Sequence, residues 1–278
     1  MIDVQSFSPG LSRGDDGIWY PRAETSEPVS YPAVGNENSF SVEDSSFWFR
    51  HRNRCIVSAV TTYPPVGQGL IFDIGGGNGF VSAGLAEAGF PSAVVEPGGV
   101  GASNARRRGL EVICATTDAA GFREGSLPAV GLFDVVEHVE DDLVFLQSLR
   151  RLLDTNGRLY LTVPAYPFLW SAEDVSAGHF RRYSLGDIER VLRKAEFEVE
   201  FASYIFRYLP LPIYLLRTLP HKLGWARTRK NMSRDHAAKS GVAGRVLGWA
   251  LRPEVARLNA GKPMKFGGSC LVVARKAS

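Results

Sequence analysis

Short apolar runs alternate with amphipathic stretches through the middle of the chain. The first run, residues 70–74, leads into glycines and then into a helical stretch that Gly89 ends. Leu143, Leu146 and Leu149 show the helical spacing of a later stretch. The strand candidates in this part are residues 70–74, 93–96, 110–114, 130–133 and 159–163. Because strands separated by helices pair in parallel, the pattern predicts an α/β fold with a doubly wound parallel sheet.

Two further strand candidates, residues 197–205 and 269–274, bring the predicted sheet to seven strands. Between them lies an insertion, residues 206–267, that a minimal α/β domain does not need. We expect this insertion to be partly helical, with one helix around residues 242–251. It is predicted either to cover the substrate or to contact a membrane surface.

The N-terminal part differs from this pattern. Residues 1–43 are rich in Pro, Gly, Ser and Asp without sustained periodicity, so we expect an extended or partly disordered arm. A helix begins near Asp44 and continues through Val60. It either lids a pocket or packs its apolar side on the sheet. Residues 44–278 are then one domain.

Composition limits the class of protein. An apolar content of 45% and a charged content of 22% are ordinary for a soluble globular domain. The cysteines Cys55, Cys114 and Cys270 are far apart and odd in number, which argues against a disulfide framework or a zinc site. Residues 1–10 have neither a basic start nor an apolar core, so no signal peptide is expected and a cytoplasmic location is favoured.

Charge is unevenly distributed along the chain. Residues 201–278 hold 15 Lys and Arg against two acids, Asp235 and Glu254, a net charge of +13. Residues 1–200 hold 17 basic and 27 acidic side chains, a net charge of −10. The basic part is either a solvated tail or a surface for anionic lipid, phosphate or nucleic acid.

An apolar run inside the insertion favours lipid among these partners. Residues 208–216 are mostly apolar, and Arg207 and Arg217 flank them. The run is broken by prolines and is too short to span a bilayer, which needs about 20 apolar residues. An interfacial or pocket-covering segment fits better. We therefore expect peripheral contact with the inner membrane surface through the basic C-terminal region.

Three glycines, Gly75, Gly77 and Gly79, follow the first strand at alternate positions. Glycines at a strand-to-helix turn let a ligand approach the backbone. A dinucleotide site needs Gly-x-Gly-x-x-Gly, but Phe80 stands where the last glycine would fall. No Gly-x-x-x-x-Gly-Lys-Ser/Thr loop is present either. Both kinds of nucleotide site are thus excluded by spacing.

Acidic residues lie at or just past the ends of four predicted strands: Asp73, Glu96, Asp118 and Asp134. The carboxyl ends of parallel strands meet at one edge of the sheet, where ligands of open α/β folds bind. The ligand should therefore be cationic or rich in hydrogen-bond donors.

In their order, these motifs resemble class I S-adenosylmethionine-dependent methyltransferases. The shared elements are Asp-Ile-Gly-Gly-Gly-Asn-Gly from Asp73, Glu96 twenty-three residues later, Thr117-Asp118-Ala119 and Phe133-Asp134-Val135-Val136-Glu137-His138. The resemblance extends from about residue 47 to residue 275. It implies a Rossmann-like fold with a mostly parallel seven-stranded sheet, an enzyme, and S-adenosyl-L-methionine as cofactor.

The resemblance also implies roles for single residues. Asp73 would lie near the amino acid part of the cofactor, above the glycine loop. Glu96 would accept both ribose hydroxyls, and Asp118 would bind the adenine amino group. The implied cofactor-binding residues are Asp73, Gly75, Gly77, Gly79, Glu96, Asp118, Ala119 and Asp134.

Two histidines are candidates for catalysis. A hydroxyl acceptor must lose its proton, and histidine has the required pKa range. His138 follows the fourth strand, and His179 lies in the loop after the fifth. Arg181 and Arg182 either hold an anionic acceptor or pair with the acids at residues 173–174.

Asp134-x-x-Glu137-His138 looks like the metal motif of small-RNA 2′-O-methyltransferases and of ubiquinone-pathway O-methyltransferases. In the RNA enzymes a later histidine completes the site, and His179 is the match here. Asp134 is shorter than the Glu of that motif, so we do not expect a metal. A divalent ion at Asp134, Glu137, His138 and His179 is the alternative.

A wider pattern resembles a bacterial subgroup of type 11/12-like methyltransferases. It comprises residues 170–174, 178–184 and 268–276, together with the aromatic start of the first long helix. That subgroup is associated with surface-glycan and prenyl-lipid-linked pathways. The expected acceptor is therefore a small-molecule, glycan or lipid-linked hydroxyl, and nucleic acid is not the expected partner. The alternatives are RNA 2′-O-methylation, C- or N-methylation, and a catalytically inactive cofactor-binding subunit.

Overall fold

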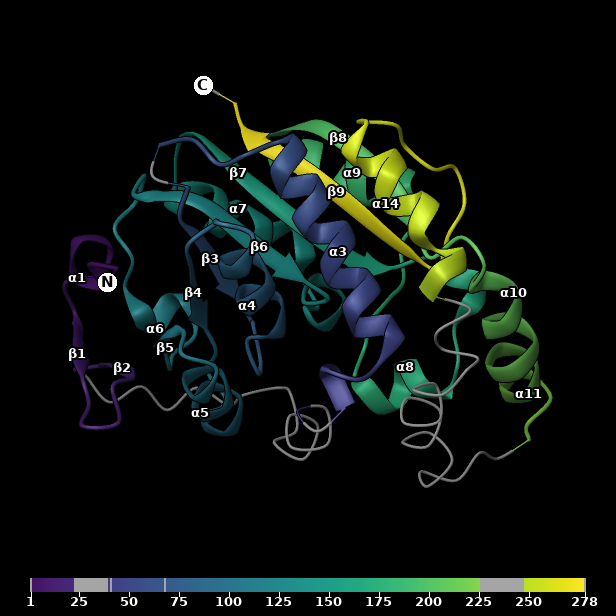
Figure 1. Cartoon of the computed structure of the whole chain (residues 1–278), viewed down its shortest axis with the longest axis horizontal. Coiled ribbons are helices and arrows are strands. Elements are labelled where there is room, and N and C mark those ends of the chain that lie inside the picture. Colours follow the sequence, from purple (N-terminus) through teal and green to yellow (C-terminus); the bar gives the residue numbers. More distant parts are fainter. Residues whose placement is uncertain (1, 23–39, 41, 68, 226–247, 278) are drawn as a thin grey trace.

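A nine-stranded sheet forms the centre of the computed structural model, which describes residues 2–22, 40, 42–67, 69–225 and 248–277. The strand order is β1-β2-β5-β4-β3-β6-β7-β9-β8 (Figure 1). Pairing is parallel from β2 to β7 and antiparallel at β1, β9 and β8. The strands are β1 (Leu11–Arg13), β2 (Trp19–Pro21), β3 (Ile71–Ile74), β4 (Ser92–Val95), β5 (Glu111–Ile113), β6 (Leu127–Phe133), β7 (Leu153–Pro164), β8 (Phe197–Ile205) and β9 (Ser269–Lys276). The predicted doubly wound α/β fold is confirmed.

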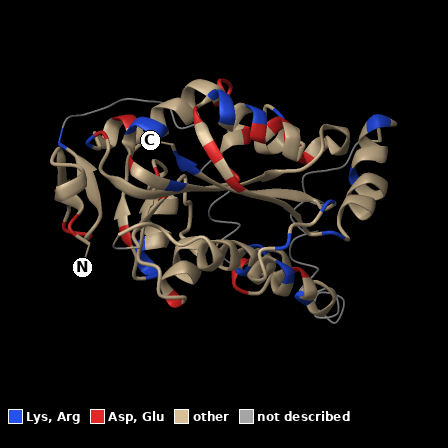
Figure 2. Cartoon of the chain, turned by 90° about the horizontal axis from the view of Figure 1, so that it is seen from above, with Lys and Arg blue, Asp and Glu red and all other residues tan. Residues whose placement is uncertain are grey.

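Helices cover both faces of the sheet, as Figure 2 shows. Side chains alternate along β3 and β7: Phe72 and Leu161 belong to one core cluster, whereas Ile71 and Tyr160 belong to the other. The first cluster packs against α7 (Asp142–Leu152) and α9 (Leu185–Lys194). The second packs against α3 (Phe47–Thr62), α4 (Phe80–Glu87) and α14 (Arg252–Asn259). The predicted helix before the first strand thus packs its apolar side on the sheet.

The prediction of seven strands is wrong, because the N-terminal segment adds two. Residues 2–22 form a short helix, α1 (Val4–Phe7), and the hairpin of β1 and β2, which extends the sheet beyond β5. The Trp19 indole donates a hydrogen bond to Glu111 at 2.6 Å, and Leu11 is fully buried. Strands of three residues are too short for an alternation to be read from sequence.

The insertion between β8 and β9 begins with a continuous helical segment, residues 210–222. It consists of α10 (Pro210–Ile213), a π-helical turn η3 (Tyr214–Thr218) and α11 (Leu219–Lys222). The segment projects at the end of the molecule opposite the β1–β2 hairpin (Figure 1). The chain returns through α14.

The buried carboxylate of Glu254 on α14 joins three parts of the chain. It accepts hydrogen bonds from the backbone N–H groups of Phe206 at 2.8 Å and Arg207 at 2.7 Å. It also lies 3.0 Å from Nε2 of His51 on α3. The base of the insertion is thereby tied to α3.

None of the helices in the described ranges is long and apolar enough to cross a membrane. The helix expected around residues 242–251 falls largely outside these ranges.

The N-terminal hairpin should contribute to global stability. Replacing Leu11 with Ala removes a fully buried side chain, and we expect unfolding to cost about 2–5 kcal/mol less. Urea unfolding followed by circular dichroism measures the change. Ser12→Ala, at an exposed position of the same strand, is the control and should stay within about 0.5 kcal/mol of the wild type. Equal stability of both variants would show that the hairpin is not part of the cooperative core.

Candidate active site

The loop between β3 and α4 begins at a buried carboxylate. Asp73 accepts a hydrogen bond from the Ser82 hydroxyl at 2.7 Å, and burial raises the pKa of Asp73 to about 7. Gly75, Gly77 and Gly79 all have positive φ, at 68°, 52° and 73°. A Cβ on Gly79 would lie 2.9 Å from Cβ and 3.2 Å from Cα of Ala105, so this position requires glycine for space as well as for conformation.

Glu96 connects the loop to the end of β4. Its carboxylate accepts the backbone N–H of Gly77 at 2.9 Å and that of Gly98 at 2.8 Å. Glu96 is buried, which raises the pKa of its carboxyl group. The structure therefore brings Asp73, the glycine loop and Glu96 together at the carboxyl edge of the sheet.

Asp118 and Ala119 lie in a single helical turn, α6 (Thr117–Ala120), beyond the end of β5. The Thr116 hydroxyl accepts the N–H of Ala119 at 3.2 Å and caps this turn. The Asp118 side chain is exposed, in contrast to Asp73 and Glu96. It is open to a ligand that lies across the strand ends.

Asp134 follows β6 with a positive φ of 61°, which turns its carboxylate toward neighbouring elements. One oxygen accepts the Thr162 hydroxyl of β7 at 2.8 Å, and the other pairs with the guanidinium of Arg52 on α3. The Arg52 guanidinium also lies 4.8 Å from the centre of the Trp48 ring. Helix α3 thus reaches the carboxyl edge through Arg52, a residue that sequence analysis did not select.

The two candidate histidines meet at this edge. His138 lies in a 3₁₀ turn, η1 (Val136–His138), and His179 lies just after α8 (Ala172–Ala177). Their ring centres are 4.7 Å apart in an edge-to-face arrangement. Burial and the nearby His179 lower the pKa of His138 to about 4, so this ring is neutral at pH 7.

Asp174 orients His179. Its carboxylate is fully buried and lies 2.9 Å from Nδ1 of His179 and 2.7 Å from Arg182. Burial alone would raise the pKa of Asp174, but the hydrogen bond from His179 and the ion pair with Arg182 lower it to about 2. Of the two uses considered for the arginine pair, Arg182 thus pairs with an acid of residues 173–174. Arg181 instead pairs with Asp142 at 2.8 Å.

Glu137 also lies beside the two histidines. One of its carboxylate oxygens is buried without a hydrogen-bond partner among the described residues. Burial, with the nearby Asp134, raises the pKa of Glu137 well above its ordinary value. Ligand atoms of Glu137, His138 and His179 all lie within 4.8 Å of one another. Asp134 is outside this group, so the four-residue metal set considered from sequence is reduced to three.

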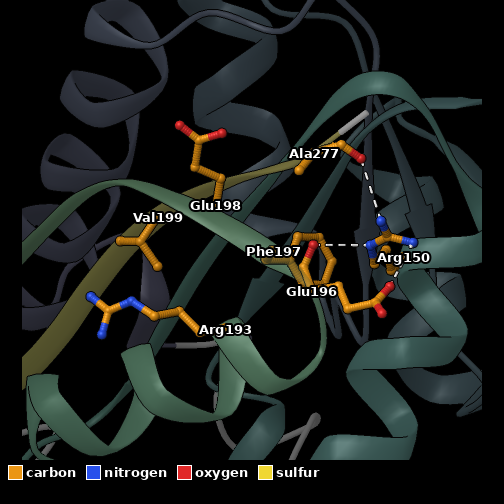
Figure 3. A pocket seen from close by; sticks show the side chains of 7 residues that line it. All are labelled: Arg150, Arg193, Glu196, Phe197, Glu198, Val199 and Ala277. Atoms are coloured by element: carbon orange, nitrogen blue, oxygen red, sulfur yellow. Dashed lines mark hydrogen bonds and ion pairs between the residues drawn. The ribbon is translucent and has the colours of Figure 1, made fainter.

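An open hollow of about 630 Å³ lies at the opposite, amino edge of the sheet (Figure 3). The charged side chains that line it all have partners: Arg193 pairs with Glu189, and Glu198 pairs with Arg275. Arg150 donates to the backbone oxygens of Glu196 at 3.0 Å and Ala277 at 3.3 Å, and it pairs with the Glu196 carboxylate at 3.3 Å. The hollow therefore presents no group prepared for chemistry.

Comparison with known proteins agrees with this geometry. A family model described as a methyltransferase domain matches residues 49–201, which is more than half of the chain. The chain belongs to the class I S-adenosylmethionine-dependent methyltransferases, as the motifs predicted. No curated protein matches the sequence significantly.

Solved structures of low sequence identity share the fold. A methyltransferase of Haloferax volcanii, in complex with the activator Trm112, has a TM-score of 0.56 at 16% identity over 88% of this chain and 96% of that one. An S-adenosylmethionine-dependent methyltransferase of Thermotoga maritima has a TM-score of 0.55 at 17% identity, over 87% and 95%. Phosphoethanolamine N-methyltransferase 2 of Haemonchus contortus, with S-adenosyl-L-methionine bound, has a TM-score of 0.55 at 18% identity, over 94% and 62%.

Glu96 should be needed for cofactor affinity. Glu96→Gln replaces a carboxylate that accepts two N–H groups with an amide that can accept through one oxygen only. We expect the Kd for S-adenosylmethionine to rise about tenfold to hundredfold, the range of one charge-assisted hydrogen bond. Isothermal titration calorimetry measures it, with the exposed Glu87→Gln on α4 as control. Unchanged affinity in Glu96→Gln would exclude Glu96 from the cofactor site.

Proposed function

We propose that this methyltransferase transfers the methyl group of S-adenosyl-L-methionine to a hydroxyl group of a small-molecule, glycan or lipid-linked acceptor. The proposal includes a cytoplasmic location, with the enzyme at the inner membrane surface. The observation that carries it is the pairing of buried Asp174 with His179 beside His138, at the edge that also holds the glycine loop.

Within this proposal the cofactor lies across the strand ends. The acidic surroundings suit its cationic sulfonium and amino groups. Asp73 would lie near the amino acid part, Glu96 near the ribose, and Asp118 with Ala119 near the adenine. The glycine loop would support the cofactor from below.

His179 has the arrangement of a general base. Because Asp174 is ionised and can only accept, Nδ1 of His179 donates to it, and Nε2 keeps its lone pair when the ring is neutral. The buried carboxylate also stabilises the imidazolium that forms when Nε2 takes a proton.

The transfer is then a single displacement. The acceptor oxygen attacks the methyl carbon, the carbon–oxygen bond forms, and the carbon–sulfur bond breaks with its electrons going to sulfur. The hydroxyl proton passes to Nε2 of His179, and S-adenosylhomocysteine leaves. The enzyme mainly aligns the two reactants. His138, which is neutral at pH 7, would limit the space in which the acceptor hydroxyl can lie.

A second candidate is metal-dependent 2′-O-methylation of RNA. It is favoured by the unpartnered buried oxygen of Glu137 next to two imidazoles, because this donor set suits a divalent ion. A metal held by Glu137, His138 and His179 would lower the pKa of the acceptor hydroxyl. We rank this candidate second because Asp134 is engaged by Arg52 and Thr162 instead.

N- and C-methylation use the same cofactor site, and one of the similar structures is an N-methyltransferase. A nitrogen or carbon acceptor differs from a hydroxyl acceptor in whether a base must remove its proton. A cofactor-binding subunit without catalysis is the remaining alternative, and the paired histidines argue against it.

The class of acceptor can be identified with labelled cofactor and extracts fractionated into lipid, glycan, RNA and small-molecule pools. We expect the label in a non-RNA pool.

The two histidines should affect turnover in that assay and not cofactor binding. His179→Ala should lower kcat about 10²–10⁴-fold, the contribution of general base catalysis, and His138→Ala should also lower it. The Kd for cofactor should stay unchanged. Val175→Ala, exposed on α8, is the matched control. Wild-type turnover in both histidine variants would refute the assignment, and binding without turnover in any pool would support the non-catalytic alternative.

Metal removal separates the two leading candidates. We expect full activity to remain after exhaustive dialysis against a chelator, because His179 and Asp174 need no metal for proton transfer. Transfer to the labelled pool is the measurement. Loss of activity that Mg²⁺, Mn²⁺ or Zn²⁺ restores, together with sensitivity of the product to ribonuclease, would favour RNA methylation instead.

A further inference from the structure

The helical segment of residues 210–222 exposes an apolar face. Leu211, Leu215, Leu219 and Leu223 recur every fourth residue, which places them along one side of the helix. Leu211 is 65% exposed, Leu215 49% and Leu223 54%. A helix on the surface of a soluble domain usually has polar residues on its outer side. We therefore expect the outer side of this segment to contact an apolar partner.

The exposed face is held in place by the other side of the same segment. Thr218 is buried and donates to the backbone oxygen of Leu169 at 2.9 Å. Arg217 lies 3.7 Å from Glu173 on α8, and Ile213 packs against the second core cluster. The segment is thus docked on the domain, with Leu211, Leu215 and Leu223 exposed and Leu219 half-buried.

Aromatic side chains extend this apolar surface. Tyr208 and Trp225, at the two ends of the segment, are 48% and 67% exposed. Phe168, in the turn η2 (Pro167–Leu169), is 50% exposed and its ring lies 6.3 Å from that of Tyr214. Tyrosine and tryptophan are the residues that favour a boundary between an apolar phase and water.

The charge around this face has one sign. No acidic residue occurs between Glu200 and Asp235. Arg207 and Lys222 in this stretch are exposed, whereas Arg217 pairs with Glu173 of α8. In Figure 2 the ribbon of this helical segment, at the right of the view, is blue at its basic positions and red at none. An apolar helix face bordered by Lys and Arg is typical of segments that lie in the interface of an anionic membrane.

We propose that residues 208–225 dock this enzyme on the surface of an anionic lipid bilayer, with the leucine face in the acyl boundary and the basic side chains at the headgroups. A second copy of the chain fits this face less well, because a symmetric contact would bring the basic borders of two copies together.

The docking surface lies next to the candidate catalytic residues. Glu173, which pairs with Arg217, directly precedes Asp174, the partner of His179. A bilayer at residues 208–225 would bring a lipid-linked hydroxyl close to His179. The docking specifies the membrane location that the proposed function includes, and this last step rests also on the proposed methyl transfer to a hydroxyl.

Vesicle co-sedimentation of the full chain tests the proposal. The wild type should bind vesicles of phosphatidylcholine mixed with phosphatidylglycerol, bind pure phosphatidylcholine more weakly, and lose affinity as salt increases. Leu211→Ser combined with Leu215→Ser should lower the partition coefficient at least about tenfold, because two apolar side chains no longer enter the boundary. Val66→Ser combined with Val144→Ser, two exposed apolar residues elsewhere, is the matched control and should bind as the wild type does.

A second measurement identifies the part of the protein that contacts the bilayer. Brominated phosphatidylglycerol should quench part of the tryptophan fluorescence, and Trp225→Phe should remove that part. Circular dichroism confirms that each variant is folded.

Absence of wild-type binding, equal loss in the control pair, or wild-type binding by the leucine variant would each overturn the proposal. A change from dimer to monomer in the leucine variant, measured by sedimentation without lipid, would assign the face to a second copy. Vesicle binding with no transfer to any acceptor would retain the docking and refute the proposed function alone.

Discussion

Burial of negative charge at one edge of the sheet is the constraint on which the rest of the site depends. Asp73, Glu96, Glu137 and Asp174 are all buried there, and a buried carboxylate is costly unless it is neutralised or hydrogen-bonded. Three of them have partners of different kinds. Asp174 has a cation and an imidazole, Glu96 has two backbone N–H groups, and Asp73 has the Ser82 hydroxyl. Glu137 has one oxygen with no partner in the described part of the chain. The edge is therefore prepared to gain free energy from a cationic ligand.

The same constraint separates two halves of the site. On the side of β3 and β4, the hydrogen bonds to Asp73 and Glu96 come from a hydroxyl and from backbone N–H groups, not from cations. On the side of β6 and β7, Arg52 and Arg182 already neutralise Asp134 and Asp174. The charges of these two carboxylates are balanced, and His179 lies beside one of them, within hydrogen-bonding distance of Asp174. In the proposed function, cofactor binding and proton transfer therefore fall on different strands of one sheet.

Local patterns in the sequence were sufficient to predict the central fold and to place Asp73, the glycine loop and Glu96 at one edge, because those features follow from neighbouring residues. The run before Asp73, the glycines after it and the position of Glu96 identify a strand, a turn and the next strand end. The β1–β2 hairpin was missed because its stability comes from long-range contacts such as Trp19 with Glu111. Arg52 was not selected for the same reason: it lies far from Asp134 in sequence. The orienting role of Asp174 depends on a turn that brings it back to His179, which no spacing rule predicts.

The carboxylate of Glu254 has a consequence for how this chain can vary. By bonding to the backbone of Phe206 and Arg207, it closes the insertion into a loop at its base, and the entropy of a closed loop depends only weakly on its length. The chain between these points can therefore lengthen, shorten or change composition at small cost to the sheet. Through His51, the same carboxylate keeps α3, and with it Arg52, in register while this happens. The fold thus allows the insertion to change while α3 and the sheet keep their arrangement.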